Sequence, residues 1–173
     1  SLDSQGKVIY LNTFAQSLAP SLRISYMVLP PALFARYEQG FRFYASSVPR
    51  FVQHILRRFM AEGYFERHLA RMRTLYKNRR NLFLEQIAQS SLAARIEIGG
   101  TEAGMHLLLR LQGMDEATLL ARAKQAGIRI YGLSEYYAQP VADMPQNTVI
   151  AGFSGFSDEE LVEAVGHLLA AWQ

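Results

Sequence analysis

The first thirty residues of the chain contain two short apolar runs separated by a polar stretch. Residues 7–11 are rich in β-branched and aromatic side chains, which predicts a buried strand. After the polar residues 12–21, residues 23–29 predict a second strand that stops at Pro30-Pro31. Because the first N–H groups of a helix have no partner to lose, the two prolines also favour the start of a helix.

Three helices are predicted between the prolines and residue 89. They cover residues 32–44, 51–65 and 66–89, and Gly63 marks the junction of the last two. One face of the first helix carries the apolar side chains Leu33, Tyr37, Phe41 and Tyr44. The long third helix has an apolar stripe made of Leu69, Met72, Tyr76, Phe83 and Ile87. A long helix with one apolar stripe typically packs against a sheet or another helix.

The last eighty residues have a different pattern, in which short strands and helices replace the long helices. Asp115 is a predicted N-cap for a helix that ends before Gly127, and Ser157 with Glu160 forms a capping box that opens a C-terminal helix. The buried stripe of this last helix is expected to be Leu161, Val165, Leu168 and Trp172. Strands are predicted at residues 95–98, 105–111, 128–131 and 148–151. The order strand, strand, helix, strand, strand, helix predicts a small two-layer α/β unit.

The composition is that of a soluble globular protein. Half of the 173 residues are apolar and 19% are charged, which excludes a disordered or collagen-like chain. No apolar run approaches the roughly 20 residues of a membrane helix, and no signal peptide is visible, so no membrane contact and a cytoplasmic location are expected. The absence of cysteine excludes disulfides and thiolate chemistry. The chain does not begin with Met, which suggests a piece of a longer protein.

The near-neutral net charge of +3 hides an asymmetry along the chain. Residues 36–80 carry eleven Lys and Arg against three Asp and Glu, whereas the remainder carries seven against twelve. A basic stripe of this kind is one mark of nucleic-acid binding. The arginines stand beside Glu62 and Glu66, however, and no nucleic-acid-binding motif accompanies them. A solvated face or a subunit contact is therefore the favoured interpretation.

Metal binding is not expected. The four histidines, His54, His68, His106 and His167, are far apart in the sequence. None of them has a second histidine four residues away with a carboxylate between the two, which is the arrangement of a metal-binding helix.

The segment between the two predicted N-terminal strands carries the candidate chemistry. Thr13 and Ser17 supply hydroxyl groups, and Arg23 supplies a permanent planar cation. A hydroxyl and an arginine on one loop can bind a phosphate or a carboxylate together. The alternative is that Arg23 pairs with a local carboxylate, and the spacing does not decide between the two.

This segment, residues 13–26, resembles a known motif. It is similar to the cofactor-lysine motif of fold type I pyridoxal-phosphate (PLP) aminotransferases, Thr-Phe-Ser-Lys-x-Leu-x-Pro-x-Leu-Arg-Ile-Gly-Tyr, in the form found in MocR/GntR-type transcriptional regulators. The resemblance continues over nearly the whole chain, through Glu62-Gly63, residues 66–73, residues 75–77, Ala103-Gly-Met-His106, Ile130-Tyr131 and Gly152-Phe153.

The resemblance implies an α/β fold, the C-terminal part of a fold type I PLP-transferase. Residues 1–50 would be the end of the large cofactor-binding domain and its sheet. Residues 51–90 would be the long connecting helices, and residues 91–173 the small two-layer α/β domain.

The resemblance also assigns the site residues. Thr13 and Arg23 match the two residues that contact the cofactor phosphate in the family. Gln16 stands at the position of the Schiff-base lysine, and a carboxamide can neither form that bond nor act as the general base, so no catalytic residue is expected. Asn12 and Ser25 replace glycines that are common in the motif. Ile150 fills the position of an arginine that often binds the substrate carboxylate.

The expected function is that of an aminotransferase-like effector and dimerisation domain of a MocR/GntR-type regulator, without transaminase activity. The family's other cofactor contacts lie upstream of the motif, so this chain alone is expected to bind PLP weakly or not at all. Expected partners are a second copy in a homodimer, an amino-acid-like or PLP-like effector, and DNA only through a winged-helix module outside these residues. One alternative is a fragment or lysine-to-Gln variant of an active aminotransferase, and another is a stand-alone α/β interaction domain.

Overall fold

The computed structural model describes residue 3 and residues 5–102, 104–138 and 147–173. Ala103, one of the residues that carry the resemblance, lies outside this set. The chain divides into two compact units, Ser1–Arg71 and Met72–Gln173, and each is described by itself. None of the helices formed by the described residues combines the length and apolar character needed to span a bilayer.

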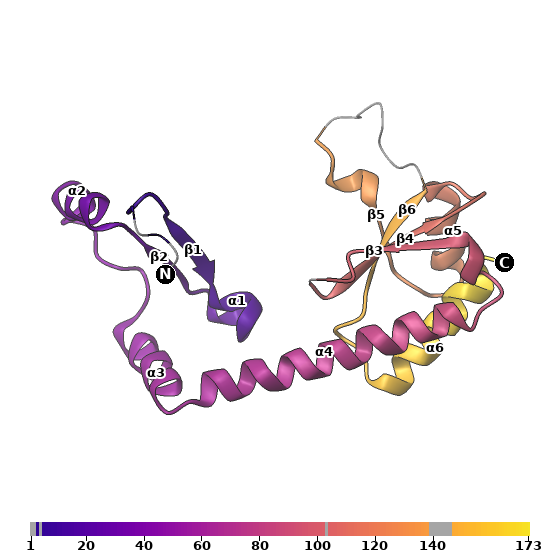
Figure 1. The fold of residues 1–173 in the computed structure, drawn as a ribbon, viewed down its shortest axis with the longest axis horizontal. Helices are drawn as coiled ribbons and strands as arrows, with labels where there is room; N and C mark the ends of the chain where they lie inside the picture. Colours follow the sequence, from indigo (N-terminus) through magenta and orange to yellow (C-terminus); the bar gives the residue numbers. More distant parts are fainter. Residues whose placement is uncertain (1–2, 4, 103, 139–146) are drawn as a thin grey trace. The chain divides into compact units, whose positions relative to one another are not determined.

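The first unit opens with a two-stranded antiparallel hairpin, β1 (Tyr10–Thr13) and β2 (Ser25–Val28), in which Thr13 pairs with Ser25 (Figure 1). Both strands are present, but β1 shares only Tyr10 and Leu11 with the predicted range 7–11, and the expected burial of this strand is wrong. Every residue of β1 except Thr13 is exposed, and Leu11 keeps 73% of its surface accessible. The described residues of this unit add no further strand to the hairpin, and strands are buried by what packs on them, not by their own composition.

The polar stretch between the strands is more ordered than the sequence predicts. It contains a one-turn helix, α1 (Phe14–Ser17), and a 3₁₀ turn, η1 (Pro20–Leu22). Three further helices follow: α2 (Pro31–Phe41), α3 (Arg50–Ala61) and the long α4 (Tyr64–Ala88), which continues into the second unit. Pro31 occupies the first turn of α2, as the two prolines predict. Gly63 has a φ of +73° and separates α3 from α4.

The helices of the first unit leave much apolar surface uncovered. Neither α2 nor α3 contains a buried residue. In the connection between them, Phe43 is 93% exposed and Tyr44 is 77% exposed. An exposed apolar surface of this extent is uncommon on a monomer in isolation and typically marks a contact surface.

The second unit contains a four-stranded antiparallel sheet in the order β3-β4-β6-β5. The strands are β3 (Ile96–Gly99), β4 (His106–Leu111), β5 (Tyr131–Gly132) and β6 (Thr148–Gly152). Helix α5 (Glu116–Gln125) lies between β4 and β5 in the sequence, and α6 (Asp158–Ala171) follows β6. The 3₁₀ turns η2 (Ala93–Arg95) and η3 (Leu133–Tyr136) complete the unit. The predicted order of elements is confirmed, although the strand expected at residues 128–131 is shorter and begins at Tyr131.

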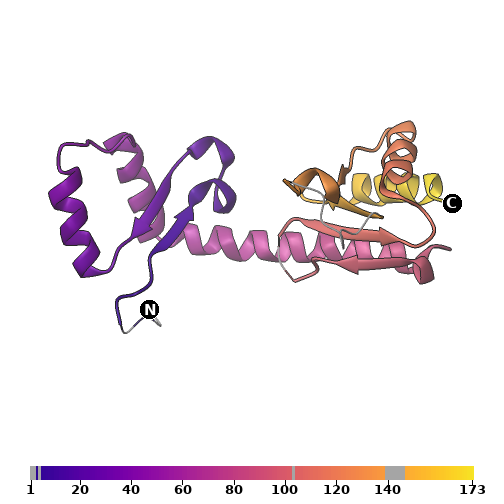
Figure 2. The same cartoon turned by 90° about the horizontal axis from the view of Figure 1, so that it is seen from above.

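One face of this sheet and three helices enclose the core of the second unit (Figure 2). Burial alternates along β4, where Leu107, Leu109 and Leu111 are buried. The helices α4, α5 and α6 supply Phe83, Ile87, Leu119, Ala123, Leu161, Val165, Leu168 and Leu169. Trp172 is completely buried, and its Nε1 donates to the carbonyl of Leu119 at 3.1 Å, so its polar atom is satisfied inside the core. The buried stripe predicted for the last helix is therefore confirmed.

Both predicted caps in the second unit are present. The side chain of Asp115 accepts a hydrogen bond from the Thr118 N–H at 2.7 Å. Ser157 Oγ accepts from the Glu160 N–H at 3.2 Å, and Glu160 Oε2 accepts from the Ser157 N–H at 2.7 Å. Each bond satisfies a helix N–H that has no partner within the helix.

We expect Ser157→Ala to lower the free energy of unfolding by about 1 kcal/mol, because the Glu160 N–H loses its acceptor. Urea unfolding followed through Trp172 fluorescence measures the effect. Ser91→Ala is the matched control, since Ser91 is exposed and lies outside the capping box. Equal effects of the two substitutions would contradict the assignment of the cap.

The capping box also predicts a pH dependence. The hydrogen bond from the Ser157 N–H, followed by the Ser157 side chain and the attraction of Arg79, holds the pKa of Glu160 below its ordinary value. A lowered pKa means that the ionised form stabilises the fold above the ordinary value of about 4.3, and that this stabilisation is lost as the pH falls through the lowered pKa. Glu160→Gln should therefore destabilise the chain at pH 7 and have little effect near pH 3 in urea unfolding. The same effect at both pH values would contradict this origin.

Candidate functional site

The carbonyl oxygen of Ile24 organises the candidate site. It accepts a hydrogen bond from the Phe14 N–H at 2.9 Å and a second from Thr13 Oγ1 at 3.1 Å. Thr13 Oγ1 in turn accepts from the Ala15 N–H at 3.2 Å, as the N-cap of α1. These bonds join the two ends of the loop, so Thr13 and Ile24 are held at the mouth of the β1–β2 hairpin.

Arg23 has an unusual backbone conformation in this loop. Its φ is +45°, and it is the one non-glycine residue among those described whose φ is positive. The left-handed region costs an L-residue roughly 1–2 kcal/mol. The turn brings the buried Ile24 into position for its carbonyl to accept both hydrogen bonds. Non-glycine residues in such conformations cluster at ligand clamps and active sites.

The guanidinium of Arg23 is solvent-exposed, and no described residue forms an ion pair or a hydrogen bond with it. The alternative that Arg23 pairs with a local carboxylate therefore finds no support among these residues. Thr13 and Arg23 lie at the two ends of a loop closed by hydrogen bonds, one with a hydroxyl and one with an available planar cation. A hydroxyl and a planar cation are both groups that bind oxyanions.

Gln16 is exposed on the single turn of α1, between the two ends of this loop. Neither its backbone nor its side chain contributes to the hydrogen bonds that close the loop. The closure of the loop therefore does not depend on the side chain at position 16. A carboxamide is a neutral hydrogen-bonding group with no nucleophilic amine.

Phe14 anchors the loop, a role that the sequence pattern did not predict. Its side chain is buried, and its ring lies 5.3 Å from the ring of Tyr26 and 5.9 Å from that of Phe65. Offset and edge-on aromatic contacts at these distances are favourable. The signal was present, because Phe14 is the single aromatic residue of the loop of residues 13–24.

Ile150, which the resemblance places at a substrate-carboxylate position, lies in an apolar part of the second unit. Ile150 lies in β6, paired with Leu108 on one side and Tyr131 on the other, and is half-buried. Its direct cross-strand neighbours thus supply no cation for a carboxylate.

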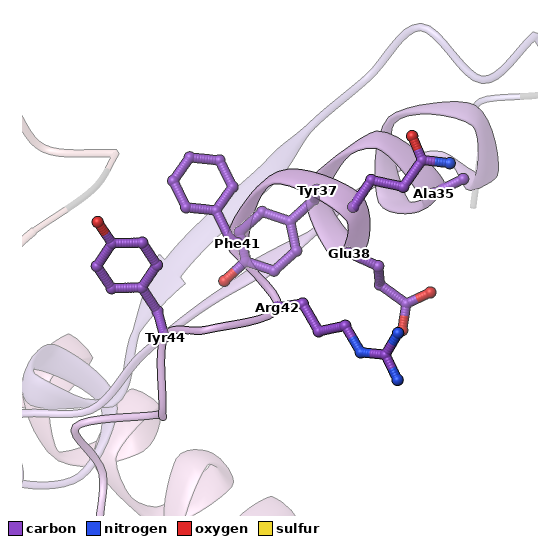
Figure 3. A pocket seen from close by; sticks show the side chains of 7 residues that line it. Ala35, Tyr37, Glu38, Phe41, Arg42 and Tyr44 are labelled. Atoms are coloured by element: carbon purple, nitrogen blue, oxygen red, sulfur yellow. The ribbon is translucent and has the colours of Figure 1, made fainter.

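A hollow in the first unit is lined in part by aromatic side chains (Figure 3). Tyr37 stacks on Phe41 with ring centroids 5.1 Å apart, and Phe41 meets Tyr44 at 5.9 Å. The three rings lie together, and the side chains of Glu38 and Arg42 extend away from them. The sequence placed the three aromatics on one helical face but did not identify a hollow. Its volume, about 680 Å³ on an open surface, suits a contact surface better than a small-molecule site.

Comparison with known proteins finds both transcriptional regulators and aminotransferases by sequence, and aminotransferases by structure. The chain is 37% identical over 174 residues to the HTH-type transcriptional regulator YdeL of Bacillus subtilis, and 36% identical over 177 residues to the probable rhizopine catabolism regulatory protein MocR of Rhizobium meliloti. Each alignment covers 99% of this chain. The crystal structure of Pyrococcus horikoshii kynurenine aminotransferase superposes with a TM-score of 0.79 and 29% identity, over 98% of this chain and 41% of that one.

The chain spans about a third of the length of the two regulators, 36% of YdeL and 34% of MocR. No protein-family model matches it. The expected α/β fold is confirmed by the superposition, which covers nearly the whole chain.

We expect Thr13→Val to expose the Phe14 and Ala15 amides to exchange. The substitution removes the donor to Ile24 and the acceptor for the Ala15 N–H, and a loss of about 1 kcal/mol corresponds to roughly fivefold faster hydrogen exchange at these amides. Thr13→Ser keeps the hydroxyl and should retain the protection. Nuclear magnetic resonance of the labelled chain measures both, and unchanged exchange in Thr13→Val would show that the loop is closed by other contacts.

Proposed function

Because the chain is a homologue of the MocR/GntR-type transcriptional regulators and has the fold of type I PLP-dependent aminotransferases, we propose that it forms part of the ligand-sensing domain of such a regulator. In this proposal the domain captures an amino-acid-like or PLP-like effector and does not catalyse transamination. The observation that carries the proposal is the closed loop of residues 13–24, which holds Thr13 and Arg23 at its two ends and exposes Gln16, the residue that the resemblance places at the lysine position.

The residues of this loop fit the phosphate end of PLP. The exposed guanidinium of Arg23, which pairs with no described residue, offers two parallel N–H donors, the geometry that matches a phosphate. Thr13 Oγ1 contributes at the other end of the loop, although its proton is donated to Ile24 in the free chain. A ligand phosphate would compete with that carbonyl for the proton. We therefore propose weak binding by Thr13 and Arg23, with the phosphate as the main determinant.

The same loop does not fit the covalent chemistry of the cofactor. PLP acts in aminotransferases as an electron sink that is bound to a lysine amine, and Gln16 has no amine. The three lysines of the chain, Lys7, Lys77 and Lys124, all lie outside residues 13–26. We therefore propose that no residue of this motif acts as nucleophile or general base.

The domain boundaries belong to the same proposal. Residues 1–50 would be part of the large cofactor domain, residues 51–90 the connecting helices and residues 91–173 the small domain. The hairpin and α2 are largely exposed while the second unit has a continuous core, and that core includes Phe83 and Ile87 from the proposed connecting helices. The exposed aromatic surface around Phe41 and Tyr44 fits a homodimer contact. DNA binding through a winged-helix module and a cytoplasmic location are further parts of this proposal.

A second candidate function is a lysine-to-Gln form of an active aminotransferase. It is favoured by one observation: the exposed position of Gln16, where a lysine could replace the carboxamide without disturbing the bonds that close the loop. The same substitution tests both candidates.

We expect Gln16→Lys to react with PLP at position 16. After borohydride reduction, peptide mass spectrometry should find the adduct on the introduced amine at about tenfold or more the level at a control lysine, because a bound phosphate raises the effective concentration of the aldehyde there. Gln39→Lys, on the exposed surface of α2, is the matched control. Equal modification of both introduced lysines would contradict phosphate capture by the loop.

The two candidates differ in the reaction expected after this modification. The sensor proposal expects that Gln16→Lys, incubated with PLP and amino acids, forms no pyridoxamine phosphate. Conversion to pyridoxamine phosphate with no other substitution would instead support the aminotransferase candidate.

A further inference from the structure

The second unit contains a basic cavity that is separate from the loop of residues 13–24. It has a volume of about 240 Å³ and is lined on one side by α4 and on the other by residues that connect β3 to β4. The lining residues of α4 are Arg73, Tyr76, Lys77 and Arg80, at positions i, i+3, i+4 and i+7, so they share one face of the helix. Phe153, at the end of β6, contributes an apolar wall.

Arg80 fixes the geometry of this cavity. Its Nη1 donates to the carbonyl of Thr101 at 2.6 Å, and its Nη2 donates to Asn81 Oδ1 at 3.3 Å. Its Nε is buried and has no hydrogen-bond partner among the described residues, which is also true of the Nε of Arg79. A buried N–H on a cation is costly to leave unpaired, and native proteins satisfy such groups with protein, water or a bound ion.

The charge of the cavity is strongly unbalanced. Three cations, Arg73, Lys77 and Arg80, line it together with one carboxylate, that of Glu102. Within the described part of the chain, none of the three cations forms an ion pair. Like charges spaced four residues apart on a helix repel one another. An anion with two negative charges would neutralise the excess and relieve that repulsion.

The neighbouring Arg79 shows what a structural arginine does in the same helix. Its Nη1 donates to the carbonyl of Ser154 at 2.7 Å, and its Nε lies 3.7 Å from Asp158 Oδ1. Arg79 thus has both a carbonyl and a carboxylate to tie it to the start of α6, although its buried Nε, like that of Arg80, has no hydrogen-bond partner among the described residues. The side chains of Arg73 and Lys77 are exposed, and no described residue offers either of them a carbonyl or a carboxylate partner. The cationic face of α4 that lines the cavity is therefore open to a ligand.

We propose that this cavity binds the phosphate group of a small phosphorylated molecule. Arg73, Lys77 and Arg80 would hold the dianion, and the guanidinium groups match its oxygens as planar forks. Tyr76 and Phe153 would flank the organic part. The volume is below that of a drug-sized pocket, so the ligand is a phosphomonoester with a small organic group and not a nucleotide or a larger cofactor.

Calorimetric titration of the 173-residue chain with phenyl phosphate and with inorganic phosphate, at constant ionic strength, tests the proposal. The titrations are made in the Arg23→Gln background, so that the N-terminal loop contributes no phosphate site. Both probes should bind saturably, and phenyl phosphate should bind more tightly because its ring contacts Tyr76 and Phe153. Benzoate, which has one charge, should bind more weakly than either.

Two substitutions locate the site. Lys77→Gln and Arg73→Gln should each weaken phenyl phosphate binding by about fivefold or more, the range expected for a partly exposed charge-assisted contact. Both side chains are exposed, and circular dichroism verifies that the fold is kept. Lys124→Gln, an exposed lysine on α5 that does not line the cavity, should leave the affinity unchanged.

Three results would overturn the proposal. The first is no saturable binding of either phosphate. The second is benzoate binding as tightly as phenyl phosphate, which would assign the cavity to carboxylates. The third is phosphate binding that Lys77→Gln and Arg73→Gln leave unchanged or that Lys124→Gln weakens equally, which would mean that the anion binds at another place or without a defined site.

Discussion

The two hydrogen bonds accepted by the Ile24 carbonyl are the constraint on which the candidate site depends. They tie the first turn of α1 to the start of β2, and the backbone between them turns through a left-handed arginine. Without them Thr13 and Arg23 would be held together only by a flexible loop. With them, a hydroxyl and a cation lie at the two ends of a closed structure. The conformational cost of Arg23 is offset by the burial of Ile24 and Phe14, which pack into the first unit.

In our proposal, binding and chemistry belong to different residues of this loop. The residues that close the loop are Thr13, Phe14 and Ile24, while the position of the family lysine is an exposed site on α1 that contributes to none of the closing bonds. In this proposal, a change from lysine to Gln at residue 16 would remove an amine and leave the hydrogen bonds that close the loop in place. A sensor and an enzyme can share such a scaffold, because the fold constrains the binding pair much more than it constrains the reactive group.

Local chemistry explains which parts of the fold were predictable. Asp115 and Ser157 were identified as caps because the hydrogen bonds of a cap join residues three apart, and Gly127 was placed after α5 from equally local signals. The apolar stripe that ends in Trp172 followed from helical periodicity. Burial of residues 7–11 was wrong, since burial depends on partners that periodicity does not reveal.

Contacts between residues distant in sequence explain the rest. Helix α1 was missed because its formation depends on Ile24, which lies on the other side of the loop. The motif located Thr13, Gln16 and Arg23, but the anchoring role of Phe14 required the three-dimensional structure. So did Arg80, whose Nε has no hydrogen-bond partner among the described residues.

In our proposal the loop of residues 13–24 holds a cofactor-like ligand through its phosphate and without a covalent bond. Calorimetric comparison of PLP with pyridoxine 5′-phosphate, which carries an alcohol in place of the aldehyde, measures this most directly. The titrations are made in the Lys77→Gln background, which weakens phosphate binding by the cavity of the second unit. We predict weak and equal affinities for the two compounds, and we predict that neither binds when Arg23 is also replaced by Gln. A clear preference for the aldehyde, or binding that does not depend on Arg23, would contradict the proposal.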